Sequence, residues 1–218
     1  MIYRDRAQAG RLLARKLAGY AGRGDLVVLA LPRGGVPVGF EVAQALVAPL
    51  DVFVVRKLGV PGQEELAMGA IASGGVLNVS SDIVRAFGVS GREIEDLVEA
   101  ERAELERRER LYRGGQPPVE VRGKVVILVD DGLATGSSMR AAVQALRPRS
   151  PARIVVAVPV APRSTGREFE TIADEMVCAA TPEPFHAVGE WYENFTQVGD
   201  EEVQDLLRRA SRVPQEAC

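Results

Sequence analysis

The chain has 218 residues, of which 46% are apolar and 26% charged, so we predict a globular protein with one sizeable core and room for a small accessory lobe. Its formal net charge of -3 gives no electrostatic reason to expect a nucleic-acid partner. With only Cys178, Cys218 and His186 available, neither a disulfide framework nor a zinc site is expected, and the lack of a signal-like or membrane-spanning apolar run predicts a cytoplasmic protein with no membrane partner.

The first half of the chain predicts a helix followed by a βαβ unit. The helix is expected from the cap residue Asp5 to about Tyr20, because leucines recur at helical spacing between them. The apolar segments 26–31 and 50–55 indicate buried strands, and the segment 36–47 between them indicates a helix.

The second half repeats this alternation. Strands are expected at 125–129, 154–158 and 176–179, and helices at 137–146 and 163–173. Because strands that alternate with helices form parallel sheets, we predict an α/β fold with a twisted parallel β-sheet flanked by helices.

Two segments interrupt the alternation. Residues 57–80 are rich in glycine and predict a mobile loop that leads into a small hairpin around 73–75. Residues 90–112 predict a long charged helix that begins with a capping box and either lies solvated over the core or contacts another subunit. The expected domains are a core at 1–180 that includes a helical insertion at 81–115, and a C-terminal hood segment and helix at 181–218.

The segment VVILVDDGLATGSSM, residues 125 to 139, places two acids and a small-residue loop after a buried strand. Ligands of open α/β sheets collect at this carboxyl end of the strands. Residues 134–138 offer backbone N–H groups, hydroxyls and the positive end of the following helix, which suit a phosphate monoester. Asp130 and Asp131 would repel that phosphate unless they bind sugar hydroxyls or a divalent cation. These features together describe a ribose 5-phosphate site.

This fifteen-residue pattern closely resembles the phosphoribosyl pyrophosphate (PRPP) motif of the type I phosphoribosyltransferases, and most resembles a group of predicted phosphoribosyltransferases that pair LPRGG with VDDGxATG. The resemblance implies the fold of that family and Mg²⁺ as cofactor. It implies that Asp130 and Asp131 act in catalysis by holding the ribose hydroxyls, directly or through Mg²⁺. The residues that would surround the 5′-phosphate are Ala134, Thr135, Gly136, Ser137 and Ser138.

A second motif, LALPRGGVPVGFEVAQAL at 29–46, resembles the pyrophosphate loop of the same family. Gly34 and Gly35 let backbone N–H groups approach an anion, and Arg33 can offer a bidentate fork to diphosphate oxygens. The resemblance also implies a pyrophosphate contact from Arg56 and Lys57, with Lys57 favoured as a catalytic group. The alternative is a glycine-containing turn followed by a pair of surface charges.

The acceptor is less constrained by the sequence. Type I phosphoribosyltransferases that use 6-oxopurines have an aspartate before the TG dipeptide, where this chain has Ala134, so this loop points away from guanine and hypoxanthine. The RGG motif, which is similar to that of the xanthine-guanine enzymes, points towards them, and the acceptor is open to being neither. From the loop alone, guanine and hypoxanthine are expected to be poor substrates. The family's acceptor site lies in a variable hood, which corresponds here to residues 181–203. Its aromatic residues, with Trp191 and Tyr192 as the better candidates, either stack a heterocyclic acceptor or form a satellite core that ties the C-terminal helix to the sheet.

We therefore expect a Mg²⁺-dependent phosphoribosyltransferase of nucleotide metabolism, which moves the 5-phosphoribosyl group from PRPP to a nitrogenous base or related nucleophile and releases pyrophosphate. Its partners are then PRPP and a heterocyclic or amine acceptor. Assembly into a homo-oligomer is left open by the sequence. Two alternatives also stay open: a regulatory protein that senses PRPP without turnover, and a hydrolase or phosphorylase of a phosphoribosyl compound.

Overall fold

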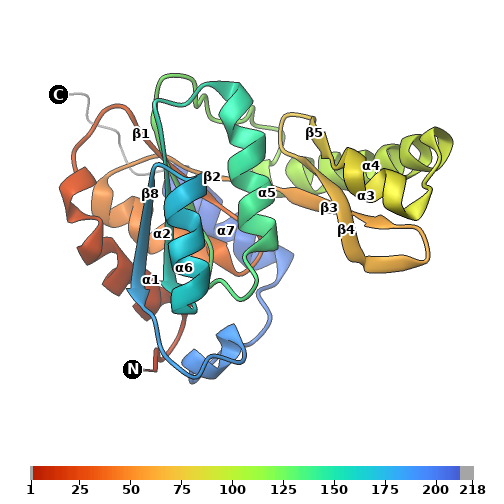
Figure 1. The fold of residues 1–218 in the computed structure, drawn as a ribbon. Coiled ribbons are helices and arrows are strands. Elements are labelled where there is room, and N and C mark those ends of the chain that lie inside the picture. Colours follow the sequence, from red (N-terminus) through yellow and green to blue (C-terminus); the bar gives the residue numbers. More distant parts are fainter. Residues whose placement is uncertain (1, 212–218) are drawn as a thin grey trace.

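The computed structural model describes residues 2–211, apart from the side chain of Glu65. Within these residues, five strands form one parallel sheet in the order β2-β1-β6-β7-β8 (Figure 1). The strands are β1 (Leu26–Ala30), β2 (Leu50–Val52), β6 (Val125–Val129), β7 (Arg153–Val160) and β8 (Glu175–Ala180). The predicted α/β fold with a parallel central sheet is confirmed. Cys218 and the last part of the predicted unit 181–218 lie outside the described residues.

Helices cover both faces of this sheet. Every residue of β1 and β6 is buried, as expected for parallel strands packed between two layers of helices. On one face α1 and α2 share a core cluster with alternate residues of these strands, and on the other face α5 and α6 do so. The helices are α1 (Arg6–Lys16), α2 (Gly35–Leu46), α5 (Ser137–Leu146) and α6 (Arg163–Ile172).

A second sheet occupies the region predicted to be a mobile loop. Its strands run antiparallel in the order β3-β4-β5, and they are β3 (Val55–Val60), β4 (Gln63–Ala72) and β5 (Val76–Val79). Gly62, Gly74 and Gly75 have positive φ angles in the two connecting turns. The hairpin predicted around 73–75 is therefore confirmed, but the predicted loop before it is strand, because its glycines make tight turns rather than a long loop.

The predicted strand 50–55 is two strands that belong to different sheets, since β2 ends at Val52 and β3 begins at Val55. After β5 comes α3 (Ser81–Phe87), which lies within the predicted helical insertion 81–115, and then α4 (Gly91–Arg113), which confirms the long charged helix and its capping box. We call residues 55–113 the arm. Figure 1 shows the arm extending from one side of the central sheet.

The last turn of α4 fixes the arm to the central sheet. Arg113 donates hydrogen bonds to the carboxylate of Asp51 and to the carbonyl oxygen of Val52, both at 2.9 Å. The side chains of Arg113 and Asp51 are only 8% and 7% exposed. Leu105 and Tyr112 on the same helix are also buried. The helix therefore lies over the core, and a contact with another subunit stays a prediction.

The remaining elements are short or lie at the edges of the molecule. The predicted helix 5–20 is α1 followed by the 3-10 helix η1 (Ala18–Tyr20). The other described elements are η2 (Arg147–Arg149), η3 (Val188–Trp191) and α7 (Asp200–Ser211), the last of which packs against α2 and α4. Across the part of the chain that the structure describes, we find no helix that is long and apolar enough to span a bilayer.

Candidate active site

The two predicted ligand loops meet at the carboxyl end of the central sheet. β1 and β6 are neighbours, with Ala30 opposite Val129, so the loops that follow them begin side by side. A Cβ atom on Gly34 would collide with the carboxylate of Asp131, and one on Gly35 would lie 2.8 Å from the carbonyl oxygen of Val129. Glycine is therefore needed at both positions because the two loops pack so closely.

The paired aspartates carry their charge in a poorly hydrated position. The backbone N–H of Asp131 donates a hydrogen bond to Oδ1 of Asp130 at 2.8 Å. Burial, followed by the negative charge of Asp131, raises the pKa of Asp130 well above its ordinary value. Burial also raises the pKa of Asp131, although the hydrogen bond from Arg6 opposes this shift. A cation or a set of hydrogen-bond donors that reached these carboxylates would relieve this accumulation of charge.

The two carboxylates of Asp130 and Asp131 suit a Mg²⁺ ion whose other ligands are water and phosphate oxygens. Within residues 2–211, no group of three or more His, Cys, Asp or Glu side chains forms a metal cage. Mg²⁺ commonly takes one or two carboxylates and completes its coordination with water and phosphate oxygens. Asp130 and Asp131 fit that pattern, because they are two adjacent carboxylates beside a loop suited to phosphate.

Arg6 is a site residue that the sequence did not reveal. Its Nε donates a hydrogen bond to Oδ2 of Asp131 at 2.8 Å, and its Nη1 donates to the carbonyl oxygen of Thr196 at 2.8 Å. Its guanidinium lies 3.9 Å from the ring centroid of Phe195. Because 125 residues separate Arg6 from Asp131, no local spacing could have indicated the contact.

Residues 134–138, which we call the phosphate loop, lead into the N-terminus of α5. Gly136 occupies the N-cap position with φ 70° and supplies no side chain to the first turn of the helix. The backbone N–H of Ser137 makes a long hydrogen bond of 3.5 Å to Oγ1 of Thr135, and the N–H groups that follow it in that turn are available to an anion. The hydroxyl of Thr165 donates to the carbonyl oxygen of Ala134 at 3.0 Å and so supports the outer side of the loop. The phosphate loop has the geometry of an anion site.

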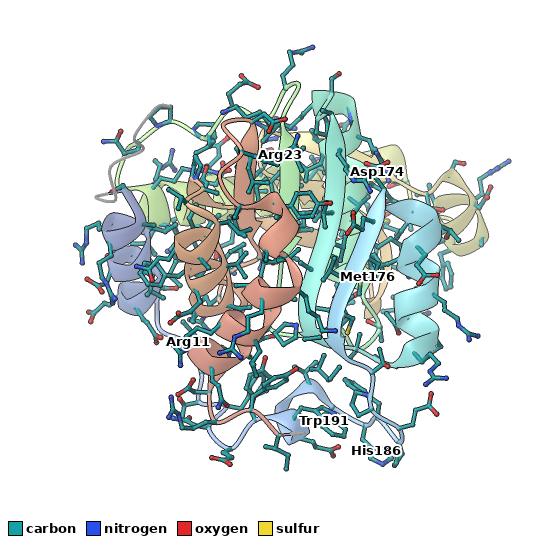
Figure 2. All side chains as sticks on the ribbon, turned by 90° about the vertical axis from the view of Figure 1, so that its left-hand side faces the viewer. Arg11, Arg23, Asp174, Met176, His186 and Trp191 are labelled. Carbon is teal, nitrogen blue, oxygen red and sulfur yellow. The ribbon has the colours of Figure 1, made fainter. Side chains whose placement is uncertain are left out.

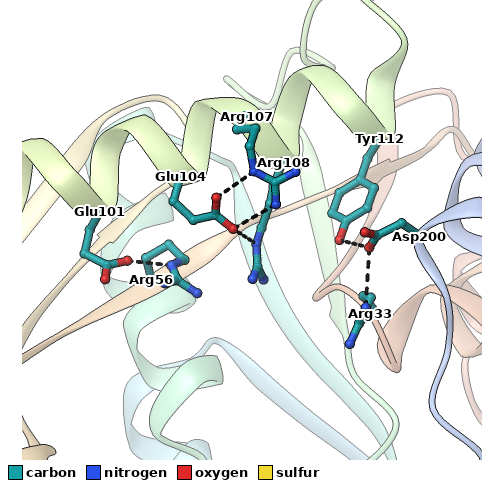
Figure 3. A network of polar contacts seen from close by, with 8 residues as sticks. All are labelled: Arg33, Arg56, Glu101, Glu104, Arg107, Arg108, Tyr112 and Asp200. Atoms are coloured by element: carbon teal, nitrogen blue, oxygen red, sulfur yellow. Dashed lines mark hydrogen bonds and ion pairs between the residues drawn. The ribbon is translucent and has the colours of Figure 1, made fainter.

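Two of the candidate pyrophosphate residues are paired with carboxylates from the helices around them. Arg33 pairs with Asp200 of α7 at 3.6 Å, and Arg56 pairs with Glu101 of α4 at 2.6 Å (Figure 3). In that view both arginines lie beneath α4 (Figure 3). The insertion helix therefore belongs to the surroundings of the candidate site.

Lys57 lies on the other face of the arm sheet. It follows Arg56 directly in β3, and neighbouring residues of a strand point to opposite faces. On that face Lys57 lines a cavity of about 510 Å³ between the arm and α5, which Ser137 of the phosphate loop also lines. The structure thus separates the basic pair, with Arg56 towards α4 and Lys57 towards α5.

Tyr192 in the hood segment is enclosed by other aromatic rings. It is 6% exposed, and its ring centroid lies 5.5 Å from that of Tyr3 and 5.0 Å from that of Phe195. Its hydroxyl donates a hydrogen bond to the backbone carbonyl oxygen of Asp131. These contacts favour the satellite-core alternative for Tyr192. The core ties the N-terminal segment to the sheet through Tyr3, whereas the sequence had suggested the C-terminal helix.

Trp191 is less enclosed than its neighbour. Its ring stacks on Phe185 with a centroid distance of 6.2 Å and an interplanar angle of 21°. Its Nε1 is buried and has no hydrogen-bond partner among the described residues. Figure 2 shows Trp191 and His186 in the hood segment near one end of the sheet. Of the two predicted acceptor residues, Trp191 has the freer position.

Comparison with known proteins identifies the class to which this fold and site belong. The family model described as phosphoribosyl transferase domain matches residues 1–194. A protein of Mycobacterium tuberculosis (strain H37Rv), whose name gives phosphoribosyl transferase as a provisional activity, is 47% identical over 211 residues that cover 97% of this chain. The chain belongs to the phosphoribosyltransferase family, and the resemblance to the type I members is confirmed.

Particular relatives show how far this likeness extends. The crystal structure of TT1426 from Thermus thermophilus is 42% identical, covers 96% of this chain and 99% of its own, and superimposes with a TM-score of 0.85. Bifunctional protein PyrR 1 of Lactiplantibacillus plantarum is 41% identical over 80 residues, which are 32% of this chain and 44% of that protein. The aligned region is 47% of the M. tuberculosis protein, so the chain spans about half the length of the curated relative it matches.

Proposed function

We propose that the protein transfers the 5-phosphoribosyl group of PRPP to a nitrogen nucleophile and releases pyrophosphate, in a Mg²⁺-dependent reaction. The observation that carries this proposal is the contact of Gly34 and Gly35 with the Asp130–Asp131 segment, beside the N-terminus of α5. It gathers groups suited to a diphosphate, a sugar diol and a phosphate monoester at one end of the sheet. PRPP carries these three groups in that order.

In this proposal each loop has one task. The backbone N–H groups of residues 134–138 bind the 5′-phosphate, and the carboxylates of Asp130 and Asp131 accept hydrogen bonds from the ribose hydroxyls. Bound Mg²⁺ supplies neutralisation of the charge that develops on the leaving pyrophosphate. The basic side chains proposed to add to this neutralisation are Arg33 and Arg56 from the α4 side, and Lys57 from the α5 side. Positioning and electrostatic stabilisation then supply most of the catalysis.

The acceptor in this proposal is a base or amine other than a 6-oxopurine. Ala134 places a methyl group where the purine enzymes of the family carry a carboxylate, so guanine and hypoxanthine gain no polar contact there. Trp191 is the aromatic residue proposed to stack the acceptor, because Tyr192 is enclosed. Trp191→Ala should then weaken acceptor use by roughly 1 to 3 kcal/mol, as in the stacking of bases on aromatic residues, and leave PRPP affinity unchanged.

Two measurements test the proposed function. The first is calorimetric titration of PRPP with and without MgCl₂ into the wild type and into the Asp130→Asn, Asp131→Asn double variant. Mg²⁺-dependent binding that the double variant loses is the expected result, and equal affinity in both proteins refutes the assignment. The second is a screen of bases and amines for pyrophosphate release. Tight binding without release from any acceptor favours the regulatory alternative, and formation of ribose 5-phosphate without an acceptor favours the hydrolase.

A further inference from the structure

The insertion helix α4 carries an arginine that points towards the candidate pyrophosphate residues. Figure 3 shows the guanidinium of Arg108 extending from α4 into the space between Arg56 and Arg33 in that view, whereas the guanidinium of Arg107 lies nearer the helix. The exposed fraction of the side chain is 33% for Arg108 and 57% for Arg107. Arg107 and Arg108 therefore point in different directions, and Arg108 is the less exposed of the two.

The hydrogen bonds of Arg108 leave its terminal edge free. Its Nε donates to Oε1 of Glu104 at 2.7 Å, much as Nε of Arg56 donates to Oε2 of Glu101 at 2.6 Å. Among residues 2–211, the Nη groups of these two arginines make no hydrogen bond with the protein. A carboxylate at Nε fixes the plane of a guanidinium and leaves the two Nη groups as a fork that matches phosphate oxygens.

The support from Glu104 persists across the physiological pH range. Hydrogen bonds from Arg107 and then Arg108 lower the pKa of Glu104 to about 2. The carboxylate is therefore ionised wherever the protein is expected to work. Because Glu104 holds both arginines, removing either one leaves it with a partner.

A chain of contacts connects Tyr112, one helical turn after Arg108 on α4, to the loops of the candidate site. The hydroxyl of Tyr112 donates to Oδ1 of Asp200 at 2.7 Å, and Asp200 pairs with Arg33. Burial raises the pKa of Tyr112 to about 12, and the positive charges of Arg108 and Arg33 both oppose this rise, which places both cations near one phenol. The neighbour of Arg33, Gly34, packs against Asp131.

We propose that Arg108 is a third arginine of the pyrophosphate subsite, contributed by the insertion helix alongside Arg33 and Arg56. This inference rests on the proposed function. A diphosphate offers several anionic oxygens, and guanidinium forks bind such oxygens in pairs. The insertion helix therefore adds a ligand-binding side chain to the site that it covers, and its role is not limited to covering the core.

The test compares Arg108→Gln with the matched control Arg107→Gln. Both variants remove one positive charge from the same turn of α4, and both leave Glu104 with one arginine. Calorimetric titrations with pyrophosphate and with ribose 5-phosphate, each with MgCl₂, measure the two subsites separately. We expect Arg108→Gln to weaken pyrophosphate binding roughly tenfold or more, on the scale of one charge-assisted hydrogen bond. Arg107→Gln should change it little, and ribose 5-phosphate affinity should be the same in both.

A third variant, Arg108→Lys, keeps the positive charge but lacks the paired Nη groups. It should recover only part of the pyrophosphate affinity that Arg108→Gln loses. Equal pyrophosphate affinity in Arg108→Gln and wild type overturns the assignment, as does an equal loss in the Arg107 and Arg108 variants. A loss of both pyrophosphate and ribose 5-phosphate binding in Arg108→Gln also overturns it, because the effect is then structural. If the folded wild type binds neither PRPP nor pyrophosphate, the proposed function itself fails, and this assignment fails with it.

Discussion

Two buried arginine–aspartate pairs, one at the arm junction and one at the candidate site, have similar geometry and different surroundings. Arg113 pairs with Asp51 at 2.9 Å, and Arg6 pairs with Asp131 at 2.8 Å. Asp51 also accepts hydrogen bonds from the backbone N–H groups of Val52 and Val119 at 2.7 and 3.0 Å. Asp131 instead lies beside a second carboxylate, Asp130, and its pKa is raised.

The comparison shows that distance alone does not reveal what an ion pair does. The junction carboxylate has its hydrogen-bonding capacity filled by the protein, so it fixes the arm and has little left to offer a ligand. The site carboxylates hold more negative charge than Arg6 can neutralise, so they are stable only with an external partner or a proton. Such an unsatisfied concentration of charge is typical of functional sites.

The largest expected effect is at the junction. Arg113→Gln leaves the buried carboxylate of Asp51 with only its backbone donors, and breaking a buried pair in this way costs about 3 to 5 kcal/mol. We expect a fall of that size in the free energy of unfolding measured with urea. The control is Arg110→Gln on the same helix, whose side chain is 72% exposed and whose loss should change stability little. Equal effects of the two variants would show that burial does not decide the contribution.

A smaller and pH-dependent effect is expected at the site. Arg6→Gln removes the cation that opposes the raised pKa of Asp131, so in the folded variant this pKa rises further. A raised carboxylate pKa contributes stability at low pH that is lost as the pH rises through the folded value. The variant should therefore lose about 2 kcal/mol relative to wild type at pH 8 and much less at pH 5, because Asp131 can accept a proton. A loss that is equal at both pH values contradicts this account.

The central sheet and the long helix of the arm could be predicted from sequence, but the paired strands β3 and β4 of the arm could not, for a physical reason. Strands buried on both faces must be continuous apolar runs, so LVVLA and VVILV identify β1 and β6 directly. The arm strands contain glycine and charged residues, and the register of β3 with β4 shifts around Gly59. No regular period remains in such strands, so their pairing is decided by tertiary contacts.

The same limit applies to the candidate site. The motifs that contain Asp131 and Gly34 are local and could each be found in the sequence, whereas their meeting depends on the pairing of β1 with β6, which only the structure shows. Arg6 and Tyr192 reach the site from the two ends of the chain, and only the folded structure shows that they contact Asp131. An aromatic residue such as Tyr192 fits a stacking site and a core equally well until its neighbours are known.

A gain in stability is the expected effect of Asp130→Asn. Burial and the charge of Asp131 raise the pKa of Asp130 above its ordinary value of 3.8, so the folded wild type binds more protons than the unfolded chain and loses stability as the pH rises through that folded pKa. Asparagine keeps an oxygen to accept the N–H of Asp131 and carries no charge. We expect about 1 kcal/mol of stabilisation at pH 7.5 and a flatter pH dependence, checked by thermal unfolding between pH 5 and 8. A destabilised variant would show that Asp130 is not held at an energetic cost.

The smallest effect is expected for an ion pair on the outer part of the arm. This pair is short but exposed, so it separates the effect of burial from the effect of the distance between the charged atoms. Arg85 and Asp82 on α3 lie 2.6 Å apart, closer than the junction pair, yet their side chains are 76% and 86% exposed. Water and salt screen such a pair, and ordering two long side chains offsets most of what remains. Arg85→Gln should therefore change the free energy of unfolding by less than about 0.5 kcal/mol. The change expected for Arg113→Gln is about 3 to 5 kcal/mol. Adding 0.5 M NaCl should shrink even the small effect of Arg85→Gln, whereas the effect of Arg113→Gln should persist because its partner is sealed from solvent. If salt reduced the effect of Arg113→Gln and left the effect of Arg85→Gln unchanged, burial would not be what distinguishes the two ion pairs.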